Sequence, residues 1–270
     1  MKTRASFPSA PHAALLLLAS FLLQYLVGAA MYDARHALGL TYEQVTTIGV
    51  LLSNGFLVAV VTHLLGLNYR DLLHPSKSSP IASFLLLVPP VLLLLPLVVL
   101  LDVALVESLE IVFPVSSWEQ AAFSSMLAPT LPAVIATCVL APLFEEILFR
   151  GILLRAFLDR YPRGLAISYS ALYFGAAHLN IYQFFLAFLL GLLLGWLYER
   201  SKSLIPCIAL HVAVNSAVMA LGAKTDLNPG LTLASTSPLT WALSIAAGAA
   251  GALVLHYILV HRRRSSADAA

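Results

Sequence analysis

The sequence predicts an all-α protein, a polytopic bundle of about eight transmembrane helices with both termini in the cytosol. Hydrophobic residues make up 60% of the chain and charged residues only 10%, whereas soluble proteins carry about 25% charged residues. Apolar runs long enough to cross a bilayer, which takes roughly 20 residues, recur along all 270 residues. The basic residues, finally, fall mainly on one side of the predicted bundle.

Turn-forming and charged residues divide the apolar runs into eight candidate spans. These are residues 13–31, 44–66, 81–105, 130–156, 164–179, 181–198, 204–222 and 238–260. The third contains Pro89, Pro90 and Pro96, and we expect a kink there because proline interrupts the helical hydrogen bonds. Lys2 and Arg4 precede the first run as they would in a secretory signal, but its length and the many later spans favour an uncleaved helix.

The distribution of basic residues predicts the orientation. With a cytosolic N-terminus, every Lys and Arg except Arg35 and Lys224 falls on the cytosolic side, as the positive-inside rule requires. The basic cluster at 262–264 then anchors a cytosolic tail. We therefore expect a multi-pass integral membrane protein, and the composition favours a bacterial cell membrane. The chain divides into three N-terminal helices, a core, and a last helix with its basic tail: residues 1–129, 130–221 and 222–270.

Three pairs of residues spaced four apart place charged or hydrogen-bonding groups inside the apolar runs. They are Glu146 with Arg150, Phe174 with His178, and His211 with Asn215. Residues at this spacing share one helix face, so each pair can point to a common interior site. A charge near the bilayer centre costs roughly 2.5–3.5 kcal/mol, so such groups persist only with partners or beside a wet cavity.

The first pair has a second carboxylate beside it. Arg150 can neutralise Glu146 within the helix, and the adjacent Glu145 is then the candidate general base. Each pair alone also has a structural explanation, as an ion pair or as a hydrogen-bonding group between helices. Together they favour a wet catalytic site. The alternative is a non-enzymatic protein, a proton-coupled transporter or a scaffold, because proton relays also use buried Glu, His and Arg.

The three pairs resemble the motifs of a family of intramembrane proteases. The CAAX protease and bacteriocin-processing (CPBP, or Abi) family shows Glu-Glu-x-x-x-Arg, Phe-x-x-x-His and His-x-x-x-Asn, which here occupy residues 145–150, 174–178 and 211–215. The resemblance covers residues 130–221 and implies a protease core there. It implies an endopeptidase that cuts a membrane-embedded or membrane-anchored protein or peptide, which in eukaryotic relatives is a prenylated tail. The expected partners are that substrate and the lipid bilayer, with no nucleic acid.

The resemblance also implies roles for the motif residues. Glu145 and His178 would activate the attacking water, and His211 and Asn215 would stabilise the oxyanion of the tetrahedral intermediate. Glu146 would hold the geometry of the site with Arg150 and would itself assist the reaction. Phe174 would be structural support.

The sequence allows two interpretations of metal dependence. His178 and His211 could bind zinc together with Glu145 or Glu146, and the family has been described both as metalloproteases and as glutamate proteases. The sequence lacks the His-Glu-x-x-His helix of the usual zinc proteases. Asn215, four residues after His211, also suits an oxyanion donor. We therefore favour a reaction without a cofactor, with zinc as the alternative.

The depth of His178 does not fit a simple bundle. The span at 164–179 is short and places His178 near its outer end, whereas Glu145 lies towards the inner end of the preceding span. Either the turn at residues 179–180 lies deep inside the protein, or the predicted boundaries are wrong.

Overall fold

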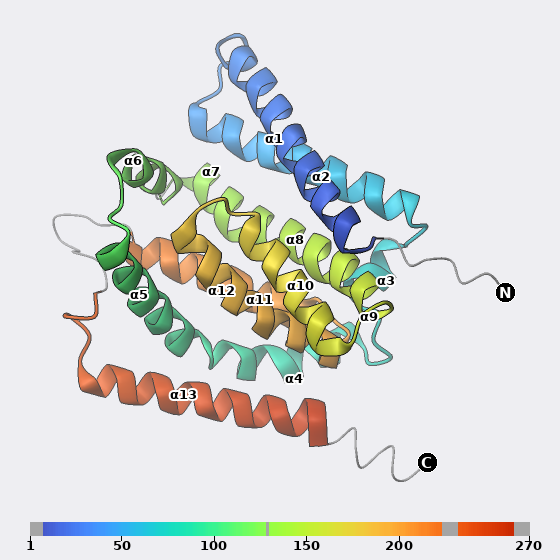
Figure 1. Cartoon of the computed structure of the whole chain (residues 1–270), viewed down its shortest axis with the longest axis vertical. Coiled ribbons are helices and arrows are strands. Elements are labelled where there is room, and N and C mark those ends of the chain that lie inside the picture. The colour runs from blue at the N-terminus through green and yellow to red at the C-terminus, as the bar shows by residue number, and fades with distance from the viewer. Residues whose placement is uncertain (1–7, 128–129, 223–231, 262–270) are drawn as a thin grey trace. The chain divides into compact units, whose positions relative to one another are not determined.

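The computed structural model describes residues 8–127, 130–222 and 232–261 (Figure 1). All regular elements within these residues are helices, which confirms the all-α class. Packing divides the chain into unit 1, residues 1–75 and 130–196, and unit 2, residues 76–129 and 197–270. The three-part division into residues 1–129, 130–221 and 222–270 stays a prediction.

The predicted number of spans is not confirmed. Among the described residues, five helices are long and apolar enough to cross a membrane, or six if one bent pair counts as a single span. The terminal basic residues used for the orientation, together with Lys224, lie outside the described residues. The cytosolic location of both termini therefore stays a prediction.

Unit 1 begins with a helical hairpin of α1 (Ala10–Leu38) and α2 (Tyr42–Leu64), drawn in blue in Figure 1. Gly39 ends α1 in the left-handed conformation, with φ 65°, which glycine adopts without strain. Thr41 caps α2: its hydroxyl accepts from the Gln44 N–H, and the Gln44 side chain accepts from the Thr41 N–H. The short helix α3 (Tyr69–Leu73) follows.

The next helical stretch of unit 1 alternates between α- and π-helix. It comprises α7 (Leu131–Val134), η1 (Ile135–Leu140), α8 (Ala141–Glu146), η2 (Ile147–Leu154) and α9 (Arg155–Leu158). Pro142 lies in the first turn of α8, where it cannot donate to the carbonyl of Cys138 and would crowd it. The wider turns of η1 accommodate this ring: the Ala141 N–H donates to the Ala136 carbonyl, five residues back.

A second hairpin consists of α10 (Arg163–Ala176) and α11 (Ile181–Ser201), of which α10 and residues 181–196 of α11 belong to unit 1. Glycines let the two helices approach closely. A Cβ added to Gly191 would lie 3.0 Å from the Cα of Ala171, and one added to Gly175 would lie 2.9 Å from the Phe184 carbonyl oxygen. The predicted span at 164–179 is thus the 14-residue helix α10, which ends before His178.

Unit 2 contains the predicted kink. Helices α4 (Pro80–Leu92) and α5 (Leu95–Val112) are bent by 46° where they meet. Helix α6 (Ser117–Met126) follows. The Ser116 hydroxyl and backbone N–H donate to the exposed Glu119 carboxylate at its start, and these bonds hold the pKa of Glu119 below its usual range.

The remaining helices of unit 2 pack on the bent pair. They are α12 (Ile205–Gly222), α13 (Pro238–His256) and the short η3 (Tyr257–His261). Helix α12 lies against α4 and α5, and α13 lies against the same two helices. Gly251 of α13 faces α4 so closely that an added Cβ would lie 2.5 Å from the Pro90 carbonyl oxygen.

Candidate active site

Glu146 and Arg150 form a completely buried ion pair. The Arg150 Nη1 donates to the Glu146 Oε1 at 2.8 Å, and neither side chain is exposed to solvent. The spacing of four residues places both groups on one helix face. A buried charge-assisted hydrogen bond is short and strong, so this pair fixes the helix around the end of α8 and the start of η2.

Phe174 joins the first motif to the second. The guanidinium carbon of Arg150 lies 4.3 Å from the centre of the Phe174 ring, which is itself buried. The His178 ring stands edge-on to the same phenyl ring, with 5.3 Å between the ring centres. Phe149 contacts it as well, at 5.2 Å. Phe174 therefore holds the arginine on one side and the imidazole on another, through a cation–π contact and aromatic edge contacts.

A backbone carbonyl orients the His178 ring. The His178 Nδ1 lies 3.0 Å from the Phe174 carbonyl oxygen, one helical turn back. Because a carbonyl oxygen can only accept, Nδ1 is the donor of this hydrogen bond. The following residue, Leu179, has a φ of 51°. This left-handed residue turns the chain from the end of α10 into α11, and the turn keeps His178 at the end of its helix.

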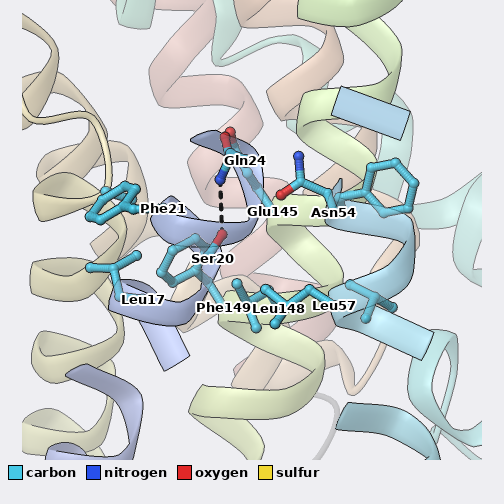
Figure 2. A pocket seen from close by; sticks show the side chains of 12 residues that line it. Leu17, Ser20, Phe21, Gln24, Asn54, Leu57, Glu145, Leu148 and Phe149 are labelled. Atoms are coloured by element: carbon cyan, nitrogen blue, oxygen red, sulfur yellow. Dashed lines mark hydrogen bonds between the residues drawn. The ribbon is translucent and has the colours of Figure 1, made fainter. Parts of the chain in front are cut away.

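Glu145 lines a cavity, unlike its neighbour in the sequence. The cavity has a volume of about 100 Å³ and lies within unit 1. Helices α1 and α2 form one wall, and α8, η2 and the end of α10 form the other. Figure 2 shows Glu145 together with Asn54 and Gln24 at one end, and Leu17, Leu57 and Leu148 at the other. Glu145 is half-buried, so its carboxylate can meet water or a substrate.

The surroundings of His178 bear on the two explanations that the sequence leaves open. Ala177, which directly precedes His178, lines the same cavity as Glu145. The turn that follows is not buried, because Leu179 is 78% exposed. The predicted boundary of this span is wrong, since α10 ends at Ala176 rather than at residue 179.

Two hydrogen bonds join helices of unit 1. The Ser170 hydroxyl of α10 donates to the Phe149 carbonyl oxygen of η2 at 2.8 Å, and Ser170 is completely buried. The Thr47 hydroxyl of α2 donates to the Pro132 carbonyl oxygen at 2.8 Å. The first bond holds α10 on η2, and the second holds α2 on the start of α7.

The third motif lies in unit 2. His211 and Asn215 are four residues apart in α12, so they share one face of that helix. His211 is buried and Asn215 is half-buried. Glu145, Glu146, Arg150, Phe174 and His178 all belong to unit 1. The structure thus brings the first two motifs together within one unit.

The residues of the alternative zinc site are divided between the two units. Glu145, Glu146 and His178 belong to unit 1, and His211 belongs to unit 2. Over residues 8–127, 130–222 and 232–261, no group of three His, Cys, Asp or Glu side chains that could hold a metal ion is found. The Glu146 carboxylate is bound to Arg150. Metal dependence stays a prediction.

Sequence reasoning missed the polar residues of the opposite wall. Ser20 and Gln24 of α1 and Asn54 of α2 line the cavity with Glu145. The available signal was weak: each is an isolated polar residue in an apolar helix, and such residues usually bond to their own helix or to a neighbour.

Comparison with known proteins supports the family predicted from the motifs. Residues 127–217 match the family model described as type II CAAX prenyl endopeptidase Rce1-like. No curated protein and no solved structure matches the chain. The matched segment contains all three motifs, and it confirms the resemblance to the CAAX protease and bacteriocin-processing family. Together with the long apolar helices, it indicates an integral membrane protein that is similar to CAAX-type endopeptidases over residues 127–217.

Proposed function

We propose that this protein is an intramembrane endopeptidase in which Glu145, assisted by His178, activates a water molecule for attack on a peptide bond. The observation that carries the proposal is the different environment of two adjacent carboxylates. Glu146 is completely buried and bound to Arg150, whereas Glu145 opens onto a cavity. One carboxylate is therefore enclosed in the protein with its arginine, and the other lines a space that can hold water.

The reaction follows from general acid–base catalysis. The Glu145 carboxylate accepts a proton from water, and the resulting hydroxide attacks the carbonyl carbon of the scissile bond. The proton that Glu145 took from water then passes through the His178 Nε2 to the leaving nitrogen as the C–N bond breaks, which returns both side chains to their starting state. His178 suits this transfer, because its Nδ1 is held by the Phe174 carbonyl and its Nε2 can accept and then donate the proton.

His211 and Asn215 are proposed to stabilise the oxyanion of the intermediate. This role rests on the family motif and on side-chain chemistry: a protonated ring nitrogen and an amide can both donate to a developing negative charge. Glu146 is proposed to assist mainly by fixing Arg150, and through it Phe174 and the His178 ring.

The proposed reaction needs no metal ion. Glu145 supplies the base, and the ion pair with Arg150 occupies Glu146. We expect the substrate to be a membrane-embedded or membrane-anchored protein or peptide, without involvement of nucleic acid. The matching family is named for prenyl endopeptidases, so a peptide with a prenylated C-terminal tail is the first substrate class to test.

The decisive experiment compares protein termini in membranes from cells that express the wild type, Glu145→Gln or Glu110→Gln. Glu110 is an exposed glutamate of α5 and serves as the matched control. We expect new N- and C-termini with the wild type and with Glu110→Gln, and their loss with Glu145→Gln. Cleavage that persists in Glu145→Gln contradicts the proposal. A pH-dependent ion flux in proteoliposomes, with no proteolysis, would favour a transporter instead.

A further inference from the structure

The cavity beside Glu145 has one polar and one apolar end. Ser20, Gln24, Asn54 and Glu145 are its polar lining residues, and all other lining residues are apolar. Figure 2 shows Gln24, Asn54 and Glu145 gathered in the upper half of the view and the leucines in the lower half. A volume of about 100 Å³ accommodates several water molecules, because one water needs roughly 10–15 Å³ on this measure.

Asn54 presents an acceptor to this cavity. Its Nδ2 donates to the Val50 carbonyl of its own helix at 3.2 Å. That bond orients the amide, and Figure 2 shows the Asn54 oxygen turned towards the side where Glu145 and Gln24 lie. An amide inside an apolar helix costs free energy unless its polar atoms find partners. The neighbouring Ser53 differs, since it is buried, bonds to the Gly49 carbonyl and does not line the cavity.

Ser20 and Gln24 extend the polar end along α1. The Gln24 Nε2 donates to the Ser20 Oγ at 2.9 Å, as the dashed line in Figure 2 shows. Ser20 is only 5% exposed although it belongs to a helix whose surface is mostly exposed. These two residues therefore form an ordered polar pair that faces the same cavity as Glu145.

We propose that Asn54, together with Ser20 and Gln24, binds the water molecule that Glu145 deprotonates. This inference rests on the proposed function and deepens it. A water that donates one hydrogen to the Glu145 carboxylate and the other to the Asn54 oxygen directs its lone pairs away from both acceptors. That orientation is the one required for attack on a carbonyl carbon, and fixing it removes an entropic cost from the reaction.

The test uses the purified full-length chain in lipid vesicles. The probe is a quenched fluorescent peptide that spans a cleavage site found by the terminal comparison above. Asn54→Leu keeps the size of the side chain and removes its hydrogen bonds. We expect kcat to fall about 10- to 100-fold, as for misplacement of a reacting group, with little change in KM because water rather than peptide is lost. Asn54→Ser restores a small polar group and should recover part of kcat.

The control is Ser53→Ala, which removes a hydrogen bond on the same helix outside the cavity. Its kcat should stay at the wild-type value, and thermal unfolding of each variant shows whether it is folded. The water assignment is overturned if Asn54→Leu keeps kcat within about twofold, if it changes KM alone, or if Asn54→Ser is no better than Asn54→Leu. These outcomes differ from failure of the proposed function, which would appear as full activity of Glu145→Gln.

Discussion

Replacement of Arg150 by methionine should strongly destabilise the protein. Arg150 and Glu146 are both 0% exposed and lie 2.8 Å apart. The Arg150 Nε and Nη2 make no hydrogen bond among the described residues, so its main partners are Glu146 and the face of Phe174. Removing one member of a buried ion pair costs about 3–5 kcal/mol, because the other charge stays behind in an apolar environment. Loss of the cation–π contact adds up to about 2 kcal/mol.

The double variant separates charge from packing. Glu146→Leu combined with Arg150→Met removes both charges while keeping apolar volume in the core. Replacing a complete buried ion pair in this way is often neutral for stability. We therefore expect the double variant to be more stable than Arg150→Met by about 3 kcal/mol, and its cleavage rate to stay within about tenfold of the wild type.

The free energy of unfolding is measured by reversible unfolding in mixed micelles of increasing SDS content, followed by tryptophan fluorescence. The values for the variants are then combined in a double-mutant cycle. Peptide cleavage is measured on the same samples. The reasoning is refuted if Arg150→Met unfolds within about 1 kcal/mol of the wild type, or if the double variant is no more stable than Arg150→Met. A stable double variant without any cleavage would show that the charged pair is needed for the reaction as well as for packing.

Three further predictions concern packing and metal dependence. Gly175→Ala should lower the free energy of unfolding by about 1–3 kcal/mol, because its Cβ would lie 2.9 Å from the Phe184 carbonyl oxygen. Gly164→Ala on the same helix has open space around its Cβ and should be neutral or stabilising. The SDS titration measures the free energy of unfolding of both variants. Gly251→Ala should loosen α13 from α4, since its Cβ would lie 2.5 Å from the Pro90 carbonyl oxygen, and disulfide trapping between cysteines placed on the two helices should report the loss. Dialysis against a strong chelator should leave peptide cleavage unchanged, and loss of activity that zinc restores would contradict the proposed metal-free reaction.

Much of the candidate site could be predicted from the sequence, because each motif consists of residues close together in one helix. An i, i+4 pair such as Glu146 and Arg150 shares a helix face whatever surrounds the helix, so its ion pair could be anticipated from spacing alone. The kink between α4 and α5 could be anticipated in the same way, since proline removes a helical hydrogen bond wherever it stands. Both features depend on a few adjacent residues.

The end of α10 could not be predicted, because it depends on tertiary packing. Hydropathy describes α10 as an apolar segment but does not show at which residue the helix ends. The glycines at 175 and 191 allow α11 to pack closely on α10, and the left-handed Leu179 allows the chain to turn at once. A count of spans by hydropathy therefore includes α10, although it has only 14 residues.

The opposite wall of the cavity shows a different limit of sequence reasoning. The family match begins at residue 127, yet three of the four polar residues lining the cavity belong to α1 and α2. A carboxylate alone does not orient water, because it offers only acceptors that act from one side. The amide of Asn54 and the pair of Ser20 and Gln24 add polar groups on a second side. We infer that the matched segment supplies the base, and that helices outside it supply the environment in which the base can act.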